Sequence, residues 1–327
     1  LQFFGLAVTN NSLFIFNFRC LMKKFIRKTI ILSIIPVFFA FASIFVFKYK
    51  ANNIKVDKFT NIIILGDSHT QSGIDDSIIK NSLNVSQSSE HFLYSYNVLK
   101  LILNNNSQID KVILGVSFHS FGKSYDKYIR DEDKTMVMFP RYFPILNLES
   151  MIDIDNVPLK QVKNIIKRTI KPLFKNSTIH NYSFLGSFYK SNRSNLNDST
   201  INAAVQRHYF TDSGDEQEYS EYQVKYLNKI VELCRTRNIE LIIINTPIHY
   251  KYYKKIPEKF LTNYYSTIQQ FNSKIHFYDF HSVEFTQDSY GDGDHLNSIG
   301  AKKLSLLISE KIEAENKAQT HNNVYKK

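Results

Sequence analysis

Two short segments of the chain carry residue types that could act together in nucleophilic catalysis. The first is Gly66-Asp67-Ser68-His69-Thr70, which directly follows the apolar run at residues 61–65. A glycine at the end of a strand lets the backbone turn sharply. Ser68 would then stand above the sheet at the start of a helical turn, where its own N–H can stabilise an oxyanion.

The second segment is Gly291-Asp292-Gly293-Asp294-His295-Leu296-Asn297-Ser298-Ile299-Gly300. Asp292 and His295 are three residues apart, so they can face one another in a turn. The carboxylate can then hold one imidazole nitrogen and leave the other free to take a proton from a serine hydroxyl. Asn297 or Ser298 is expected to cap the following helix and so fix the end of the loop.

The elements that must position these segments alternate along the chain. Continuous apolar runs predict buried parallel strands at residues 61–65, 83–85, 111–116, 240–244 and 275–278. Apolar spacings of three and four predict helices at residues 74–81, 90–104, 219–237, 257–271 and 298–314. This alternation predicts an α/β fold, with a five-stranded parallel sheet between two helical layers. Because sites in such sheets form at the carboxyl ends of the strands, Ser68 and His295 are expected at one edge.

The alternation of predicted strands and helices is interrupted at residues 119–217. They contain no clear strand and four of the prolines, and we interpret them as a large helical insertion that forms a lid or a substrate-binding cap. Within it, residues 159–174 are basic and amphipathic, which is typical either of a solvated helix face or of a contact with anionic glycans or lipid headgroups. The polar residues 316–327 are expected to form a frayed tail.

Taken together, the Ser68 segment and Asp292-x-x-His295 resemble the SGNH/GDSL hydrolase family, over residues 59–315. The resemblance implies a flavodoxin-like domain in which Ser68 is the nucleophile, His295 the general base and acid, and Asp292 the orienting carboxylate, with a covalent acyl-enzyme. The insertion, the apolar N-terminal segment and the Asp-His-Leu-Asn sequence are similar to the alginate and teichoic acid acylation branch (AlgX/AlgJ-like and DltD-like proteins). That branch implies a surface polysaccharide as substrate and a membrane-bound acyl-donor protein as partner.

The chain departs from this family at the oxyanion hole. The family has a glycine after the second strand and an asparagine after the third, whereas this chain has Asn84-Val85-Ser86-Gln87-Ser88-Ser89-Glu90 and Ser117 there. A missing donor would cost roughly 2.7–4 kcal/mol. The candidate donors are the N–H of Ser68, a backbone N–H near Gln87 or Ser88, and Ser117 or His119. His69 and His249 are candidates for substrate contact, with simple packing equally open for each.

The N-terminal region carries a membrane signature. Residues 29–47 contain no charge, and at 1.5 Å per residue these 19 residues span about 28 Å, close to a bilayer core. We predict a membrane anchor at residues 22–50 and a linker at 51–58, and we leave residues 1–21 out because Met22-Lys23-Lys24 is typical of a bacterial start. A signal peptide cleaved after Ala40-Phe41-Ala42 is the alternative. The implied substrate places the body outside the cytoplasm.

Charge and composition exclude several functions. The net charge is +11, but residues 1–58 hold nine Lys/Arg and one acid, so most of the excess adjoins the apolar segment and favours a membrane over a nucleic acid. Two cysteines exclude a disulfide scaffold and a multi-cysteine zinc module. No cofactor is expected. A metal-dependent phosphoesterase lacks its further ligands here, whereas a non-catalytic glycan-binding or assembly factor on the same fold stays open beside the esterase or acyltransferase.

Overall fold

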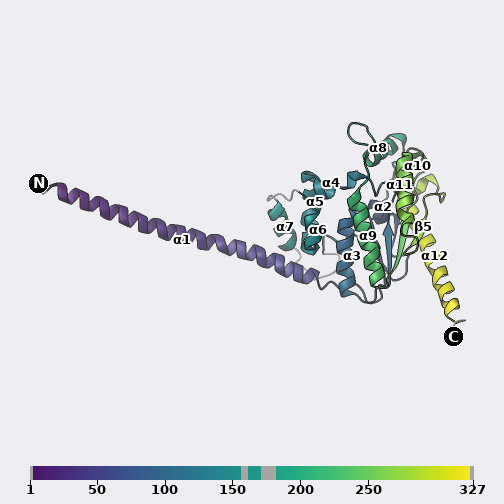
Figure 1. Cartoon of the computed structure of the whole chain (residues 1–327), viewed down its shortest axis with the longest axis horizontal. Helices are drawn as coiled ribbons and strands as arrows, with labels where there is room; N and C mark the ends of the chain where they lie inside the picture. The colour runs from purple at the N-terminus through teal and green to yellow at the C-terminus, as the bar shows by residue number, and fades with distance from the viewer. Residues whose placement is uncertain (1–2, 156–160, 171–181, 325–327) are drawn as a thin grey trace.

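The computed structural model describes residues 3–155, 161–170 and 182–324 (Figure 1). Its centre is a sheet of five parallel strands in the order β2-β1-β3-β4-β5. The strands are β1 (Ile62–Leu65), β2 (Ser82–Asn84), β3 (Lys111–Gly115), β4 (Glu240–Asn245) and β5 (His276–Asp279). All five predicted strands are therefore confirmed to within about a residue, and the order is that of the flavodoxin-like fold.

Helices cover both faces of the sheet, which confirms the predicted three layers. Alternate strand residues point to opposite faces, so Ile63 and Ile64 of β1 belong to two different apolar clusters. The helices α3 (Phe92–Asn105), α9 (Glu221–Thr236) and α11 (Glu258–Gln269) contribute to one cluster. The other cluster contains Leu304, Ile308 and Ile312 of α12 (Ser298–Val324). Because both faces are covered, the strand sequences are apolar without alternation.

One predicted helix was wrong. Residues 74–81 form turns, and the helix lies earlier, as α2 (Ser68–Gly73). Local hydrogen bonds stabilise the turns, since the Asp75 carboxylate accepts from the backbone and hydroxyl of Ser77. The Asn84 amide also donates to the carbonyl of Ile74, where a helix would need that acceptor. The predicted frayed tail is corrected too, because α12 continues through it to Val324.

Helices make up much of the described chain between β3 and β4, which has no strand of the sheet. It contains η1 (Lys123–Tyr125), α4 (Lys127–Arg130), α5 (Glu132–Tyr142), η2 (Phe143–Ile145), α6 (Leu148–Ile152), α7 (Gln161–Ile170) and α8 (Asp198–Tyr209). The basic segment predicted at 159–174 corresponds to α7, and its two ends lie outside the described residues. Residues 182–197 run as irregular chain toward α8. Beyond β4 there are two short elements, α10 (Tyr250–Tyr253) and η5 (Gln287–Ser289).

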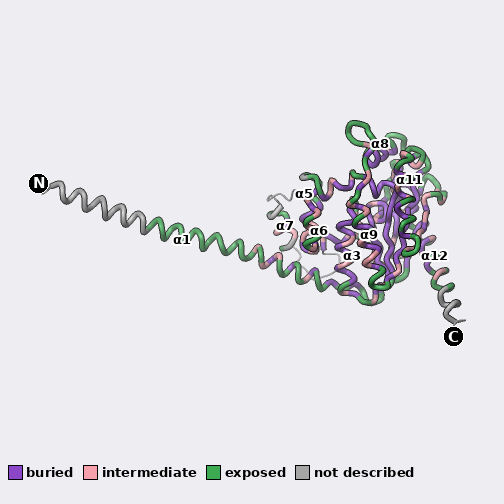
Figure 2. The backbone as a smooth tube through the Cα atoms, viewed as in Figure 1, coloured by how far each residue is buried: buried purple, intermediate pink, exposed green. Residues whose placement is uncertain are grey.

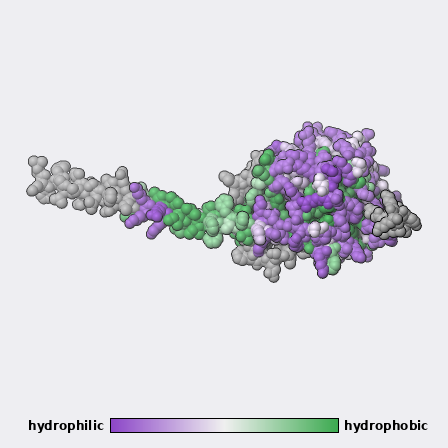
Figure 3. Space-filling model, turned by 60° about the horizontal axis from the view of Figure 1, so that its bottom comes forward, coloured by the Kyte–Doolittle hydropathy of each residue, from purple (hydrophilic) through white to green (hydrophobic). Residues whose placement is uncertain are grey.

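The N-terminal helix α1 (Phe3–Ala51) projects from the body as a long rod (Figure 1). Its part Leu21–Ala51 is long and apolar enough to cross a membrane, and most of its side chains are exposed (Figure 2). In Figure 3 the apolar surface of this rod contrasts with the largely hydrophilic body. Its last turns are different, because Phe47 and Ala51 are buried in the core of the body.

Candidate active site

The turn after β1 presents Ser68. Gly66 has a φ of +148°, which an L side chain rarely adopts, and a Cβ there would lie 2.3 Å from the Thr70 hydroxyl oxygen. Asp67 then caps α2, because its carboxylate accepts the backbone N–H of His69 at 2.9 Å. Ser68 is therefore the first residue of α2, half-buried at the carboxyl edge of the sheet.

A second loop brings His295 to the same edge. The buried Asn297 side chain fixes this loop, since its amide donates to the carbonyls of Asp288 at 2.7 Å and Tyr290 at 3.2 Å. Its oxygen accepts the backbone N–H of Ile299 at 2.9 Å, which confirms the predicted capping of the last helix. The end of the loop is thus anchored to both its own start and α12.

The structure brings Ser68, His295 and Asp292 into one hydrogen-bonded row. The Nε2 atom of His295 lies 2.8 Å from the Oγ atom of Ser68. The Nδ1 atom of the same ring lies 3.0 and 3.3 Å from the two carboxylate oxygens of Asp292. An acceptor on Nδ1 holds the proton there and leaves the lone pair of Nε2 facing the serine hydroxyl. This arrangement can deprotonate Ser68 as it attacks.

A second carboxylate approaches the same ring. Asp294 is buried, and its Oδ1 atom lies 3.5 Å from the Nδ1 atom of His295. Burial by itself disfavours a charged imidazole, but the negative charge of Asp294 and the hydrogen bond to Asp292 outweigh it and raise the pKa of His295 to about 10. Burial opposes ionisation of Asp294 too, yet the neighbouring His295 and His69 hold its pKa well below the usual range.

Three further histidines pack behind the row. The His69 ring stands 4.6 Å from that of His295 and 4.5 Å from that of His119, measured between centroids. His119 and His208 are stacked at 4.1 Å. Burial, together with the neighbouring imidazoles, lowers the pKa of both His119 and His208, so these two rings are neutral near pH 7.

Asp67 anchors the far end of this histidine cluster. Its Oδ2 atom accepts the Tyr125 hydroxyl at 2.7 Å and lies 3.2 Å from the Nε2 atom of His119. Burial opposes ionisation of this carboxyl group, but the His119 hydrogen bond and the nearby imidazoles outweigh it and hold its pKa well below the usual range. Asp67 therefore stays charged and ties the turn after β1 to η1.

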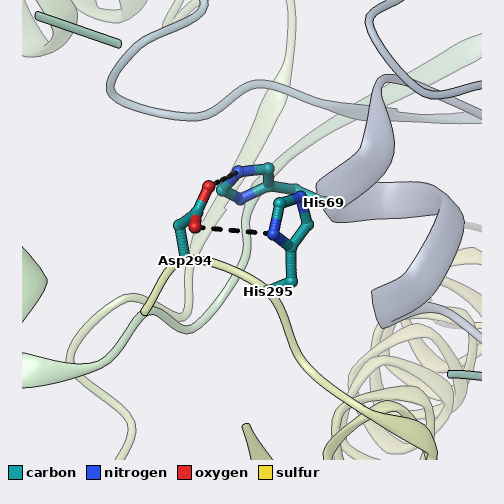
Figure 4. A group of neighbouring side chains, drawn as sticks. All are labelled: His69, Asp294 and His295. Carbon is teal, nitrogen blue, oxygen red and sulfur yellow. Dashed lines mark ion pairs between the residues drawn. The ribbon is translucent and has the colours of Figure 1, made fainter. Parts of the chain in front are cut away.

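The group His69, Asp294 and His295 could offer a metal ion three ligand atoms within 4.8 Å of one another (Figure 4). Two contacts compete with that use. The Nδ1 atom of His295 already faces Asp292, and the guanidinium of Arg207 lies 3.5 Å from the Oδ2 atom of Asp294. A positive side chain at that oxygen disfavours a second cation there. The geometry is better explained as an ionic contact that orients His295.

Ser68 and His295 open into a cavity of about 450 Å³. Its lining residues come from α2, the loop after β2, the segment between β3 and β4, and the His295 loop. The lining residues are Ser68, Gln71, Ser72, Ser88, Ser89, Ser124, Tyr125, Lys127, Tyr128, Tyr189, Ser191, Arg193, Arg207, His208, Gly291, Asp292, His295 and Leu296. The interrupting segment therefore builds much of the space that a substrate would enter.

The predicted oxyanion and substrate residues lie in different places. Ser88 lines the cavity, whereas Gln87, Ser117 and His249 are not among the lining residues in the described part of the chain. The side-chain oxygen of Gln87 accepts a hydrogen bond from Arg141, and the Ser117 N–H donates to the Ser120 hydroxyl at 2.9 Å. His249 caps α10. His69 and His119 lie buried beside the triad, as described above.

Several residues at the site were missed by the sequence analysis. Gln71 stands one turn after Ser68 on α2, and its side-chain oxygen accepts both the N–H of Ser88 at 3.0 Å and the Ser88 hydroxyl at 2.7 Å. The helical spacing from Ser68 was a usable signal for Gln71. Lys127, Arg193 and Arg207 gave no such signal, because they reach the site through the tertiary arrangement of the insertion.

Comparison with known proteins gives only remote similarity. One family model matches residues 205–317, less than half of the chain, and carries no description of a function. No curated protein matches significantly. Three solved structures overlap with most of the chain.

The first, a proposed platelet activating factor from Streptococcus pneumoniae, is 14% identical with a TM-score of 0.40, and the match covers 81% of this chain and 88% of that one. A proposed acylhydrolase from Bacteroides fragilis is 12% identical with a TM-score of 0.38, covering 82% and 93%. A GDSL-like lipase from Bacteroides thetaiotaomicron is 10% identical with a TM-score of 0.36, covering 80% and 91%. TM-scores this low carry no argument about function, so the function is argued from the geometry of this chain alone.

Proposed function

We propose that this chain is a serine esterase or O-acyltransferase that forms an acyl-enzyme on Ser68. The observation that carries the proposal is the row Ser68 Oγ, His295 Nε2, His295 Nδ1 and Asp292, with contacts of 2.8 and 3.0 Å. This row comes from two loops far apart in the sequence and opens into a cavity. A protein that only binds its ligand would also need the cavity, but it would not need a serine, an imidazole and a carboxylate in this hydrogen-bonded order.

The chemistry follows from the row. As the Ser68 oxygen attacks the carbonyl carbon of an ester, its proton passes to the Nε2 atom of His295. The carbon–oxygen bond to the leaving alcohol then breaks, and His295 returns the proton to that alcohol, leaving an acyl group on Ser68. Water or a second hydroxyl next attacks this acyl group and gives its own proton to His295. The bond between the acyl carbon and the Ser68 oxygen then breaks, and His295 returns the proton to Ser68. Water yields a free acid, and a sugar hydroxyl yields a new ester.

The oxyanion that forms when Ser68 attacks an ester needs hydrogen-bond donors. This chain lacks the glycine and the asparagine that supply them in the family it resembles, so other donors are required. The N–H of Ser68 lies in the first turn of α2, where helical N–H groups have no partner within the helix. Gln71 is the second candidate. Two donors from Ser88 fix its side-chain oxygen, so its amide nitrogen points away from Ser88 in a cavity that it shares with Ser68. We therefore assign Gln71 as a donor to the oxyanion.

An acylated carbohydrate of the cell envelope or of an exported polysaccharide is the proposed substrate. Serine and tyrosine side chains dominate the cavity wall, and they suit the hydroxyl groups and ring faces of sugars. The apolar part of α1 would tether the enzyme to the cytoplasmic membrane, with the body outside the cytoplasm. A reporter that is active only outside the cytoplasm, fused after Lys327, tests this orientation, and an inactive, well-expressed fusion would contradict it.

The enzymatic proposal is tested with a fluorophosphonate probe on the full chain in detergent. Labelling of wild type, with loss by at least a thousandfold in both Ser68→Ala and His295→Ala, is expected because each variant breaks the row. Ser72→Ala is the matched control, because Ser72 also lines the cavity but bonds to the Ser68 carbonyl at 2.8 Å. Equal labelling of all four proteins, or none, would contradict the proposal. Acetylated and bare oligosaccharides then separate hydrolysis from transfer.

A further inference from the structure

Three cationic side chains line the cavity that contains Ser68. Lys127 belongs to α4, Arg193 to the irregular segment before α8, and Arg207 to α8 itself, and all three line the cavity that holds the triad. They come from three separate parts of the insertion, so no single basic helix face explains their meeting. The only carboxylate among the lining residues is Asp292, which already faces His295.

These charges are poorly compensated within the described part of the protein. Neither Lys127 nor Arg193 has a carboxylate partner among the ion pairs found there. Arg207 lies 3.5 Å from Asp294, but that buried carboxylate also faces His69 and His295. By contrast, Lys123, one turn before Lys127, is paired with Glu218 on the outer surface.

Lys127 also lies close to other positive charges. Lys127 is half-buried, and its burial together with the positive charges of Lys134 and Arg207 lowers its pKa. Such crowding is unfavourable in the empty protein and is relieved by an anion that binds among the cations. Guanidinium groups such as those of Arg193 and Arg207 present two parallel N–H donors, which match the oxygens of a carboxylate, sulfate or phosphate.

We infer that the substrate is an acylated carbohydrate carrying an anionic group close to the ester, held by Lys127, Arg193 and Arg207. This inference rests on the esterase or acyltransferase proposed above and specifies its substrate class. The hydroxyls of Ser124, Tyr128 and Ser191 in the same wall would bind the sugar, and the cations would place the anionic group so that the ester faces Ser68. A neutral acylated sugar would leave Lys127 and Arg193 without an anionic partner, and it would be selected against.

The test compares two acetylated oligosaccharides on the full chain in detergent, with released acetate as the readout. One is acetylated oligogalacturonate, whose sugars carry carboxylates, and the other is acetylated xylo-oligosaccharide, whose backbone is neutral. Acetylated oligosaccharides carrying sulfate or phosphate in place of the carboxylate form a third arm and identify which anion is preferred. Wild type is expected to favour an anionic substrate at least tenfold in kcat/KM, and added salt should reduce that preference.

The variants Lys127→Gln and Arg193→Gln should each lower the ratio of anionic to neutral kcat/KM about tenfold, mainly through KM, because each removes a hydrogen bond to a charged group. The double variant should lose the preference altogether. Lys123→Gln is the matched control, and its ratio should stay that of wild type.

Equal turnover of neutral and anionic substrates by wild type, or an unchanged ratio in the double variant, would overturn the inference. Failure of the proposed function looks different, because Ser68→Ala would then release acetate as fast as wild type from every substrate. A wild type that is labelled at Ser68 by fluorophosphonate and prefers the neutral oligosaccharide would keep the enzyme and refute the anionic substrate.

Discussion

Replacing Asp294 by asparagine should move the pH dependence of the enzyme toward acid. His295 must be neutral to accept the Ser68 proton, so activity rises with pH through the pKa of His295. Asp294 raises that pKa by favouring the charged ring, and wild type is therefore expected to reach half of its maximal rate well above neutral pH. Removing the negative charge lowers the pKa of His295, and the rise then begins at lower pH.

The size of the shift follows from the distance. Two unit charges 3.5 Å apart attract by about 5 kcal/mol at an effective dielectric constant of about 20. That energy corresponds to roughly three pKa units. Because His69 and Arg207 lie at 3.4 and 3.5 Å from the same carboxylate and share its charge, we expect a shift of about two units in Asp294→Asn.

The assay is the second-order rate of fluorophosphonate labelling from pH 5 upward to beyond the pKa of His295, about 10, measured on the full chain. Asp294→Asn should keep a plateau rate within about tenfold of wild type, because Asp292 still orients the ring. Asp292→Asn serves as the contrast, with a plateau lowered by about 10⁴-fold. Asp212→Asn, which replaces an exposed acid in the turn after α8, controls for general charge effects. An Asp294→Asn profile that coincides with wild type, or moves toward alkali, would refute the reasoning.

Three other outcomes follow from the site and its surroundings. Gln71→Ala should lower kcat by about 10²–10³ with little change in KM, as measured on acetylated oligosaccharide, if its amide binds the oxyanion; an unchanged kcat would exclude that role. Glu90 is buried, which raises its pKa to about 8, so folding stability should fall as pH rises from about 4.5 to 8. Glu90→Gln should remove this dependence and raise the unfolding temperature at pH 8, and a lower unfolding temperature would contradict it. Dialysis against EDTA should leave turnover unchanged, because Asp292 and Arg207 already engage His295 and Asp294; activity lost on chelation and restored by Zn²⁺ would show a metal role.

The fold was predictable because burial on both faces leaves a simple sequence pattern. Each strand is a short apolar run, and the helices that cover it repeat their apolar residues every three or four positions. The prediction was wrong at residues 74–81, where apolar spacing suggested a helix but Asp75 and Asn84 bond to the backbone instead. Short polar side chains compete with helical hydrogen bonds, and spacing alone does not reveal that competition.

The positions of Ser68 and His295 could be predicted from the sequence for a related reason. Ser68 and His295 follow strand ends, and parallel strands place those ends together. The positions of the three cations could not be predicted, because they depend on how the insertion folds over the sheet. Asp294 lies in the same segment as His295, but its contact with the His295 ring depends on the conformation of that loop. Sequence motifs locate groups that act through short loops, whereas groups delivered by a large insertion need coordinates.

If α1 spans a membrane as proposed, its buried end would restrict how the body can move above the bilayer. The Phe47 ring packs at 5.7 Å from Tyr182 and 6.5 Å from Phe184, so the rod continues into the body without a slack hinge. The same stretch of chain leads on to Tyr189 and Arg193 in the cavity wall. A cavity attached in this way would stay at a nearly constant distance from the membrane surface. Only polymer segments at that distance could then reach Ser68, and segments farther from the membrane would not be modified.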